Sequence, residues 1–261
     1  MYLLGVDIGS TTSKCVVMRD GAEIIGSAVI PVGTGTSGPA RAMEAALKDA
    51  GLTQADMDVT AATGYGRNTL SEAGHVFSEL SCHARGAYWL FPGVRTVLDI
   101  GGQDAKALSV LPGGKLGGFV MNDKCAAGTG RFLEVMARIL DIDLDTLSRL
   151  DLESQECVEI SSTCTVFAES EVISQLSKGT KPEDLAAAIS RAVAFRGCGL
   201  LRRLGLTEPL FMTGGVARHG GVVRAIEAEL KIPVHTDQRA QLAGAIGAAL
   251  MAYDKITREG E

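Results

Sequence analysis

The stretch GVDIGSTTSK, residues 5–14, is a short apolar strand that ends at an aspartate and runs into a loop of glycine and hydroxyl residues. VLDIGGQDAK, residues 97–106, can be laid on it without a gap, so that Asp, Ile, Gly and Lys coincide. In both copies a second strand, a turn and a third strand follow, and the turns are Asp20-Gly21 and Pro112-Gly113-Gly114. Internal similarity of this kind indicates a duplicated architecture. We therefore predict an α/β protein with two related lobes, each beginning with a three-stranded antiparallel meander.

The two aspartates of the repeat, Asp7 and Asp99, are charges at the ends of buried strands. A loop rich in glycine and hydroxyls can offer N–H and O–H groups to phosphates, while the carboxylate holds Mg²⁺ through water. One such loop alone is also typical of an ordinary polar turn. The recurrence favours the functional interpretation, in which the two aspartates face each other across a cleft and hold one Mg-nucleotide.

Two further glycine-rich elements follow strands. Pro209–Ala217 is a short buried strand that ends at Gly214-Gly215, a turn that lets a ligand such as adenosine approach the backbone. Thr63-Gly64-Tyr65-Gly66-Arg67 is a functional turn or a simple connection, and the sequence does not decide between them. A last helix rich in Ala and Gly is expected at 240–252, and the tail at 257–261 is expected to fray.

Composition excludes several classes of protein. The 261 residues carry a formal charge of -6, which argues against nucleic acid or an anionic membrane as the main partner. No apolar run approaches the roughly 18–20 residues of a membrane-spanning helix, and the N-terminus reads directly into a strand rather than a signal peptide. We expect a cytoplasmic protein, in which the six cysteines are thiols or metal ligands rather than disulfides.

Two of the cysteines precede predicted helices. Cys125 lies in NDKCAAGTGRFLEVMARIL, residues 122–140, and Cys164 in STCTVFAESEVISQL, residues 162–176. The N–H groups and positive dipole at a helix start favour a thiolate, a phosphate or an anionic cluster. A 4Fe-4S cluster or a Cys₄ zinc site needs four thiolates, which a two-fold homodimer would supply from two per subunit. From the residues alone, ordinary thiols and a zinc or redox pair stay open as alternatives.

Taken together, the phosphate loops, the Gly214-Gly215 turn and the last helix resemble the actin/sugar kinase/heat-shock chaperone ATPase superfamily. This resemblance implies two ribonuclease H-like lobes with a nucleotide cleft between them. We place the N-terminal lobe at 1–92 and the C-terminal lobe, with the cysteine helices and the adenosine loop, at 93–261. Packing of the last helix back on the first lobe is a variant of this division.

Both cysteine motifs, and also Ser81–Ala87, closely resemble the activator component of 2-hydroxyacyl-CoA dehydratases. This ATP-dependent reductase is of the BadF/BadG/BcrA/BcrD type, which also includes ATPase subunits of benzoyl-CoA reductase. The resemblance implies that Cys125 and Cys164 from both subunits of a homodimer hold one 4Fe-4S cluster. It also implies that an electron passes from reduced ferredoxin or flavodoxin to a separate dehydratase, at the expense of ATP.

The site residues are carried over from the resemblance by position. Asp7 and Asp99 would organise Mg²⁺ and water, and Gln103, Asp104 or Glu79 would place the attacking water. Cys15, Cys82, Cys157 and Cys198 are left without a role. The residues expected to bind ATP or ADP are Gly9, Ser10, Thr11, Thr12, Lys14, Gly101, Gly102, Gln103, Gly128, Thr129, Gly130, Gly214, Gly215, Val216 and Ala217.

If Gly128-Thr129-Gly130 reaches the phosphates, closing of the lobes on ATP would tilt the helix that follows Cys125. A tilt would change the exposure of the cluster and the hydrogen bonds to its sulfurs, which tune an iron–sulfur potential. The rival functions are a small-molecule kinase of the same fold (N-acetylhexosamine type), an activator of a benzoyl-CoA reductase or a double-cubane cluster protein, and a nucleotide sensor without turnover. The kinase would need an acceptor pocket with a catalytic carboxylate and neither cysteine.

Overall fold

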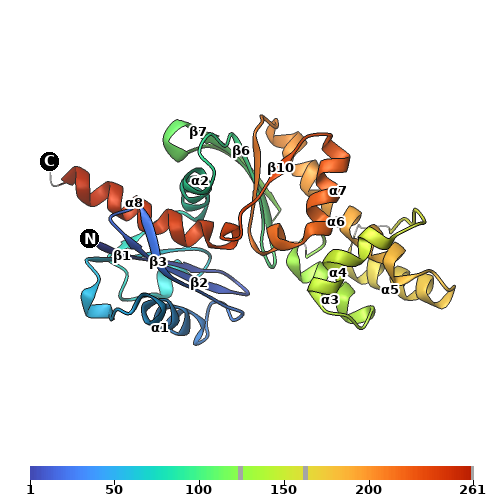
Figure 1. Ribbon diagram of the computed structural model, residues 1–261, viewed down its shortest axis with the longest axis horizontal. Helices are drawn as coiled ribbons and strands as arrows, with labels where there is room; N and C mark the ends of the chain where they lie inside the picture. Colours follow the sequence, from blue (N-terminus) through green and yellow to red (C-terminus); the bar gives the residue numbers. More distant parts are fainter. Residues whose placement is uncertain (123–125, 161–163, 260–261) are drawn as a thin grey trace. The chain divides into compact units, whose positions relative to one another are not determined.

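The structure is a computed structural model that describes residues 1–122, 126–160 and 164–259. Its contacts divide the chain into two units (Figure 1). The first unit comprises Met1–Val94, Val110–Gly117 and Arg239–Glu261, and the second unit comprises Arg95–Ser109 and Gly118–Gln238. The division expected at residues 92 and 93 allowed for packing of the last helix back on the first lobe. In the structure, the last helix and the tip of a hairpin group with the first unit because both pack against its helix α2.

The first unit is built on a five-stranded sheet in the order β3-β2-β1-β4-β5. The strands β1, β2 and β3 are antiparallel, and β4 runs parallel to β1. Their bounds are β1 Tyr2–Ile8, β2 Ser13–Arg19, β3 Glu23–Ile30, β4 Val59–Thr63 and β5 His75–Val76. The meander predicted from the first copy of the repeat is therefore present. Its register places Asp7 directly opposite Lys14.

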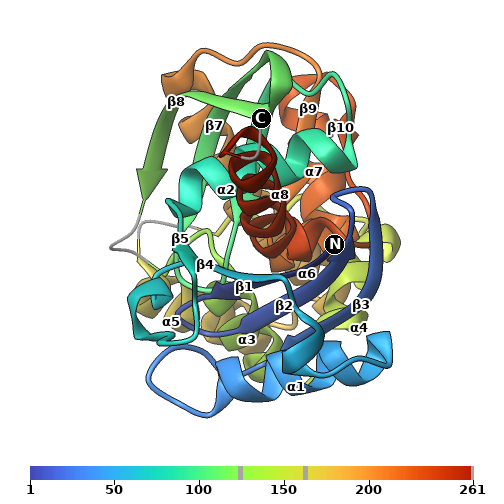
Figure 2. The same cartoon turned by 90° about the vertical axis from the view of Figure 1, so that its left-hand side faces the viewer.

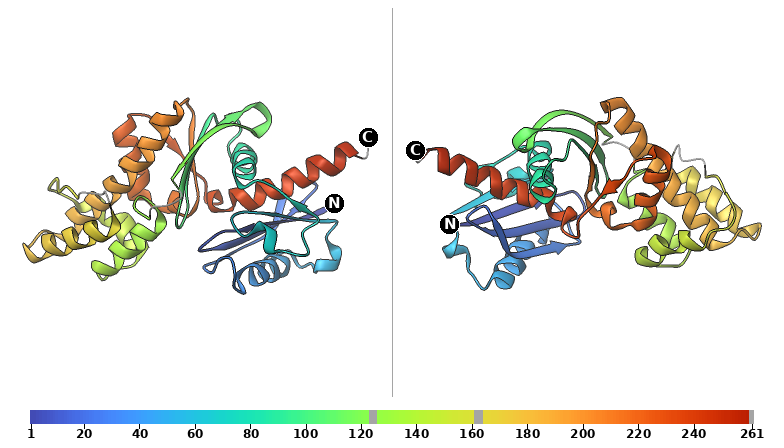
Figure 3. Two further views of the ribbon diagram at one scale, coloured as in Figure 1. Left: turned by 180° about the vertical axis from the view of Figure 1, so that it is seen from behind. Right: turned by 45° about the horizontal axis from the view of Figure 1, so that its top comes forward.

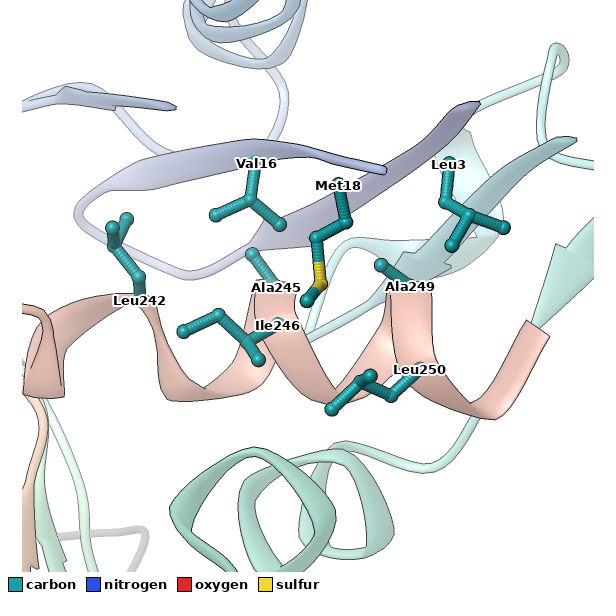
Figure 4. Close-up of a cluster of buried hydrophobic side chains, with 8 residues drawn as sticks. All are labelled: Leu3, Val16, Met18, Leu242, Ala245, Ile246, Ala249 and Leu250. Atoms are coloured by element: carbon teal, nitrogen blue, oxygen red, sulfur yellow. The ribbon is translucent and has the colours of Figure 1, made fainter. Parts of the chain in front are cut away.

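Two helices cover this sheet, α1 (Gly38–Ala50) and α8 (Ala243–Glu259), and a third, α2 (Glu79–Leu90), packs on α8. Figure 2 shows α1 along one face and α8 along the other. Side chains alternate along β1, so Leu4, Val6 and Ile8 pack toward α1, whereas Leu3 packs toward α8. The α8 face forms one apolar cluster (Figure 4), with the members Leu3, Val16, Met18, Leu242, Ala245, Ile246, Ala249 and Leu250.

Helix α8 packs closely against α2 as well as against the sheet. A Cβ atom on Gly247 would lie 1.8 Å from the carbonyl oxygen of Cys82, so only glycine permits this approach. The helix continues to Glu259, beyond the expected end at residue 252. The expected fraying at 257–259 is wrong because the Thr257 hydroxyl donates to the Tyr253 carbonyl at 2.9 Å and the backbone stays helical. Residues 260 and 261 lie outside the described residues.

The second unit repeats the plan of the first, with a sheet in the order β10-β9-β6-β7-β8. Strand β6 is antiparallel to β7 and parallel to β9, as β1 is to β2 and β4. The bounds are β6 Thr96–Ile100, β7 Ala105–Leu111, β8 Lys115–Asn122, β9 Leu210–Thr213 and β10 Val234–His235. Two sheets of matching order confirm the predicted fold of two related α/β lobes.

The helices of the second unit group around α6, the longest helix in the described ranges (Figure 3). Helix α3 buries Phe132, Leu133 and Met136 against α4, α5 and α6. It begins at Gly130, whereas the sequence suggested a start at or just after Cys125; Thr129 is still extended (φ -125°, ψ 175°). The bounds are α3 Gly130–Ile139, α4 Leu144–Leu150, α5 Thr165–Ser177, α6 Pro182–Leu204 and α7 Gly220–Leu230.

Short 3₁₀ turns complete the connections, at Gln54–Asp56, Arg67–Thr69, Pro112–Gly114, Asp151–Glu153, Gly215–Arg218 and Ala240–Leu242. Among the described helices, none combines the length and the apolar character needed to cross a bilayer.

Candidate functional site

The first unit carries an acidic strand end beside a phosphate-type loop. Asp7 is 2% exposed, and its Oδ2 lies 3.1 Å from Lys14 Nζ, as the strand register dictates. The loop that follows is closed by the Gly9 amide, which donates to the Thr12 carbonyl at 3.0 Å. A Cβ atom on Gly9 would lie 3.2 Å from Lys14 Nζ, so the ammonium group lies beside the loop. The structure thus brings a carboxylate, an ammonium group and the loop together; contact of these residues with a nucleotide stays a prediction.

Three further segments converge on Asp7. Gly64, at φ +90°, lies so close that a Cβ atom on it would be 2.4 Å from Asp7 Oδ1. A Cβ atom on Gly244 would lie 2.9 Å from Asp7 Oδ2 and 3.0 Å from His83 Nε2, so α8 and α2 also meet here. These contacts were missed from the sequence. The glycine-rich turn at 63–67 was the signal in the sequence for this meeting point.

Glu79, the first residue of α2, shares the electrostatic environment of Asp7. The pKa of the buried Cys82 thiol is raised to about 12, first by loss of solvent. The Asp7 and Glu79 carboxylates also raise this pKa, while the Thr63 hydroxyl and Arg67 lower it. The Asp7 and Glu79 carboxylates therefore both act on the Cys82 thiol. This keeps Glu79 among the candidates for placing a water molecule.

The second unit holds a more deeply buried version of the same arrangement. Asp99 Oδ1 accepts a 2.8 Å hydrogen bond from the Thr213 hydroxyl, and its Oδ2 lies 3.4 Å from Lys106 Nζ. Lys106 Nζ also lies 2.6 Å from Asp104 Oδ2, and the lysine is 2% exposed. A buried ammonium group is tolerated because it is paired. Asp104 is thus held by an ion pair, whereas Gln103 is exposed.

The glycine pair after β9 closes against the same aspartate. Gly214 has φ +83°, and a Cβ atom on it would lie 2.3 Å from the Ile100 carbonyl oxygen and 2.9 Å from Asp99 Oδ1. Only glycine fits there, because the conformation is left-handed and the backbone approach is close. The predicted adenosine loop therefore packs directly against the start of the second phosphate loop.

The start of helix α3 is bonded to this second phosphate loop. The Gly130 amide donates to the Gly101 carbonyl at 2.9 Å, and the Arg131 amide donates to the Gly102 carbonyl at 2.8 Å. The Thr129 hydroxyl donates to the Ala126 carbonyl at 2.5 Å. Because these donors are used within the protein, the helix is tied to the nucleotide loop through Gly101 and Gly102. Phosphate contact by Gly128, Thr129 and Gly130 themselves stays a prediction.

The two cysteines assigned to a metal cannot both be placed. Cys125 lies outside the described residues. Cys164 is the N-cap residue of α5, half-buried and not in a disulfide. In the ranges that the structure describes, no three His, Cys, Asp or Glu side chains are grouped to hold a metal ion. Next to Cys164, α5 exposes apolar side chains, with Phe167 at 69% and Val166 at 66% exposure.

The remaining cysteines are placed differently. Cys15, Cys82 and Cys198 are buried, and loss of solvent raises the pKa of each thiol, that of Cys198 to about 11. Cys157 is exposed. Buried thiols with raised pKa values are poor metal ligands and nucleophiles.

A groove of about 640 Å³ lies elsewhere in the first unit, between α2, α8 and the hairpin tip. Arg85 and Asp254 form an ion pair in it at 3.0 Å. None of the residues predicted to bind nucleotide or metal lines it. The lining residues are Phe77, Ser81, Arg85, Gly113, Gly114, Lys115, Leu116, Met251, Asp254, Lys255 and Arg258.

Comparisons with known proteins cover nearly the whole chain. The sequence pattern of the BadF/BadG/BcrA/BcrD ATPase family matches residues 4–252. The (R)-2-hydroxyglutaryl-CoA dehydratase activating ATPase of Acidaminococcus fermentans is 53% identical over 259 residues, which cover 99% of each chain. The activator of the 2-hydroxyisocaproyl-CoA dehydratase from Clostridium difficile, solved with bound ADPNP, superposes with a TM-score of 0.96 at 49% identity, covering 100% of this chain and 97% of that one.

The fold extends to sugar kinases. A ROK family glucokinase from Streptomyces griseus superposes with a TM-score of 0.60 at 16% identity, covering 96% of this chain and 99% of that one. At this identity the likeness concerns the fold alone, and it confirms the predicted sugar kinase-type architecture.

Proposed function

Because the chain belongs to the BadF/BadG/BcrA/BcrD ATPase family, we propose that it hydrolyses ATP to drive single electrons into a 2-hydroxyacyl-CoA dehydratase. The identity of about half of all residues with two activators of such dehydratases supports this function. The observation that carries it is the pair of amide hydrogen bonds from the start of α3 to the second phosphate loop. These bonds connect the nucleotide loop to Gly130 and Arg131, which follow Cys125 closely in the sequence. The two relatives serve different dehydratases, so the proposal is made for the class rather than for one acyl-CoA.

In this proposal both half-sites serve a single Mg-ATP. Asp7 and Asp99 would hold Mg²⁺, because each is a buried carboxylate at a strand end beside a phosphate-type loop. Lys14 balances the charge of Asp7, and the hydroxyls of Ser10, Thr11 and Thr12 are at least partly exposed for phosphate contact. The ADPNP bound to the related activator supports a nucleotide in this fold. Glu79, Gln103 and Asp104 stay alternatives for placing the attacking water.

The residues that would hold an iron–sulfur cluster are Cys164 and Cys125. Cys164 fits this role because its thiol is half-exposed at the start of a helix, where N–H groups and the dipole stabilise a thiolate. Cys125 and Cys164 together give two cysteines per chain, so a homodimer completes a set of four. The exposed Phe167 and Val166 beside Cys164 are apolar surface suited to contact with a second copy. When bound, a 4Fe-4S cluster supplies one-electron chemistry at low potential.

Coupling would run through the second phosphate loop. The amides of Gly130 and Arg131 donate to the carbonyls of Gly101 and Gly102. A change at these two glycines when ATP replaces ADP would therefore move both amides. The start of α3 would then move with the loop and displace the Cys125 segment. ATP can shift this equilibrium only by its differential affinity for the two arrangements.

The remaining partners are also part of the proposal. Reduced ferredoxin or flavodoxin donates the electron, the dehydratase component accepts it, and the protein works in the cytoplasm under anaerobic conditions. A sugar kinase function has only the fold in its favour, because the glucokinase likeness is at 16% identity.

Anaerobic purification tests the proposal. We expect a dimer with about four iron and four sulfide per dimer, a loss of that iron in Cys164→Ser, and normal iron in the matched control Cys157→Ser, whose thiol is also outside the core. ATP hydrolysis should accompany reduction of an added 2-hydroxyacyl-CoA dehydratase. A monomeric, iron-free protein that still activates the dehydratase would contradict the assignment.

A further inference from the structure

The glycine-rich turn at 63–67 is folded onto the phosphate loop of the first unit. The Gly66 amide donates to the Ile8 carbonyl at 2.8 Å, and a Cβ atom on Gly66 would lie 2.3 Å from the Thr34 hydroxyl oxygen. Thr34 itself donates its amide to the Gly9 carbonyl at 2.9 Å. Together with the contact of Gly64 on Asp7, these bonds fix the turn against the loop from two sides. A simple connection between β4 and β5 would not need this placement.

The last residue of this turn is Arg67, whose side chain folds back on the turn. Its Nη1 donates to the Gly64 carbonyl at 3.0 Å, and Gly64 is the residue that packs on the Asp7 carboxylate. The guanidinium group is therefore held against Gly64, the residue that packs on Asp7. Its influence on the buried Cys82 thiol, opposite in sign to that of Asp7 and Glu79, also places it in this charged cluster.

The guanidinium group has donors to spare. Arginine has five N–H donors in a planar fork, and a single neutral carbonyl is the acceptor recorded for Arg67 within residues 1–122, 126–160 and 164–259. Arg67 is half-buried, so part of the residue is removed from bulk water. Lys14, the other cation of this half-site, is already paired with Asp7 at 3.1 Å. Arg67 is thus the cation beside the loop whose charge is not balanced by a recorded ion pair.

We propose that Arg67 binds the terminal phosphate of ATP and stabilises the charge that develops on it during hydrolysis. A terminal phosphate beside the Asp7 carboxylate brings negative charges together, and a second cation on the Gly64 side offsets their repulsion. Arginine suits this role because its fork binds phosphate oxygens in pairs. In other ATPases and GTPases, an arginine in this role contributes about 10³–10⁵ to kcat. The inference rests on the ATPase activity and needs neither the cluster nor a partner protein.

A structural role predicts a different outcome. If Arg67 only closes the turn through the Gly64 carbonyl, its loss would loosen the phosphate loop for every nucleotide and lower the melting temperature. A role at the terminal phosphate distinguishes nucleotides, because ADP lacks that group and ADPNP retains it. The comparison of ADP with ADPNP therefore separates the two roles.

The test uses Arg67→Gln and Arg67→Lys in the full chain, with Arg41→Gln as the matched control because Arg41 is exposed on α1 and has no recorded ion pair in the described ranges. We expect Arg67→Gln to lower kcat for ATP by at least about 100-fold and to weaken ADPNP binding about tenfold or more. Affinity for ADP should change less than twofold, and added guanidinium chloride should restore part of the activity. Arg41→Gln should match the wild type throughout.

Either of two results would overturn the proposal. One is a kcat of Arg67→Gln within threefold of the wild type. The other is an equal loss of ADP and ADPNP affinity together with a lower melting temperature. If Arg67→Gln does not fold, Arg67→Lys decides, because a lysine can still reach a carbonyl but does not reproduce a bidentate fork. Wild-type kcat in Arg67→Lys would then overturn the proposal, whereas at least a tenfold loss with normal ADP affinity would support it.

Discussion

Acid should destabilise the second unit in part through a buried side chain, His219. It caps helix α7, where its Nδ1 accepts a 3.3 Å hydrogen bond from the Val222 amide, and it is 6% exposed. Burial lowers its pKa from 6.5 to about 4, although Asp151 nearby works in the opposite direction. Protonation of Nδ1 would also remove the acceptor that caps the helix. The neutral form is therefore part of the folded structure.

The sign and size follow from linkage. The unfolded chain takes up a proton at His219 below pH 6.5, whereas the folded chain resists it down to about pH 4, so stability is lost as the pH falls through this window. This difference in proton binding lowers the free energy of unfolding by about 1.4 kcal/mol at pH 5.5 and about 2.5 kcal/mol at pH 4.5. At pH 7.5 it is close to zero.

The matched variant is His219→Asn. Asparagine is a strong N-cap residue, so it can keep the cap while removing the titration. Urea unfolding of both proteins, followed by circular dichroism at pH 7.5, 5.5 and 4.5, gives the difference in unfolding free energy, in which other titrating groups cancel. We expect this difference to move in favour of His219→Asn by about 2–3 kcal/mol between pH 7.5 and 4.5. A difference that is the same at all three pH values would refute the reasoning.

Three further substitutions test the packing around the site. Lys106→Met should cost about 3–5 kcal/mol of unfolding free energy, measured by denaturant, because it leaves buried carboxylate charge without its partner; an unchanged midpoint would show that the ion pair is not needed. Thr213→Val should cost about 1–3 kcal/mol and lower kcat, since Asp99 loses a hydroxyl donor; equal stability and equal turnover would argue against that hydrogen bond. Gly247→Leu should lower the melting temperature clearly, because its Cβ would overlap the carbonyl of Cys82, whereas a stable protein would mean that α2 and α8 can separate.

The repeat made the two half-sites predictable. The gapless alignment of residues 5–14 with 97–106 predicts a strand, a turn and a second strand in each copy, and both antiparallel pairs are present. Their registers place Asp7 opposite Lys14 and Asp99 opposite Lys106, a pairing that was not predicted from the sequence. Local pattern was sufficient here since strand, loop and partner strand are adjacent in the chain.

Contacts between distant segments could not be predicted in the same way. Gly64, His83 and Gly244 meet at Asp7 from three separate elements, and no periodicity in one sequence reports on such a meeting. The length of α8 was also missed, because its last turns are held by packing on α2 and by the Thr257 hydroxyl rather than by a strong helix signal.

The start of α3 shows how local rules mislead at a site. The sequence GTG at 128–130 suggested amides free for phosphate, yet the Gly130 amide is bonded to the Gly101 carbonyl. Only the folded chain shows that the second phosphate loop is the acceptor. The proposed coupling path therefore passes from nucleotide to loop to helix, with one more step than the sequence indicated.

The most direct test of the proposed coupling is the midpoint potential of the anaerobic dimer, measured by a spectroscopic redox titration with ADP and again with ADPNP. If the nucleotide acts on the Cys125 segment through Gly101 and Gly102, the two potentials differ in the wild type. The difference disappears in Asp7→Asn, which keeps its cluster but no longer organises Mg²⁺ at the nucleotide. Equal potentials with both nucleotides in the wild type would contradict the account.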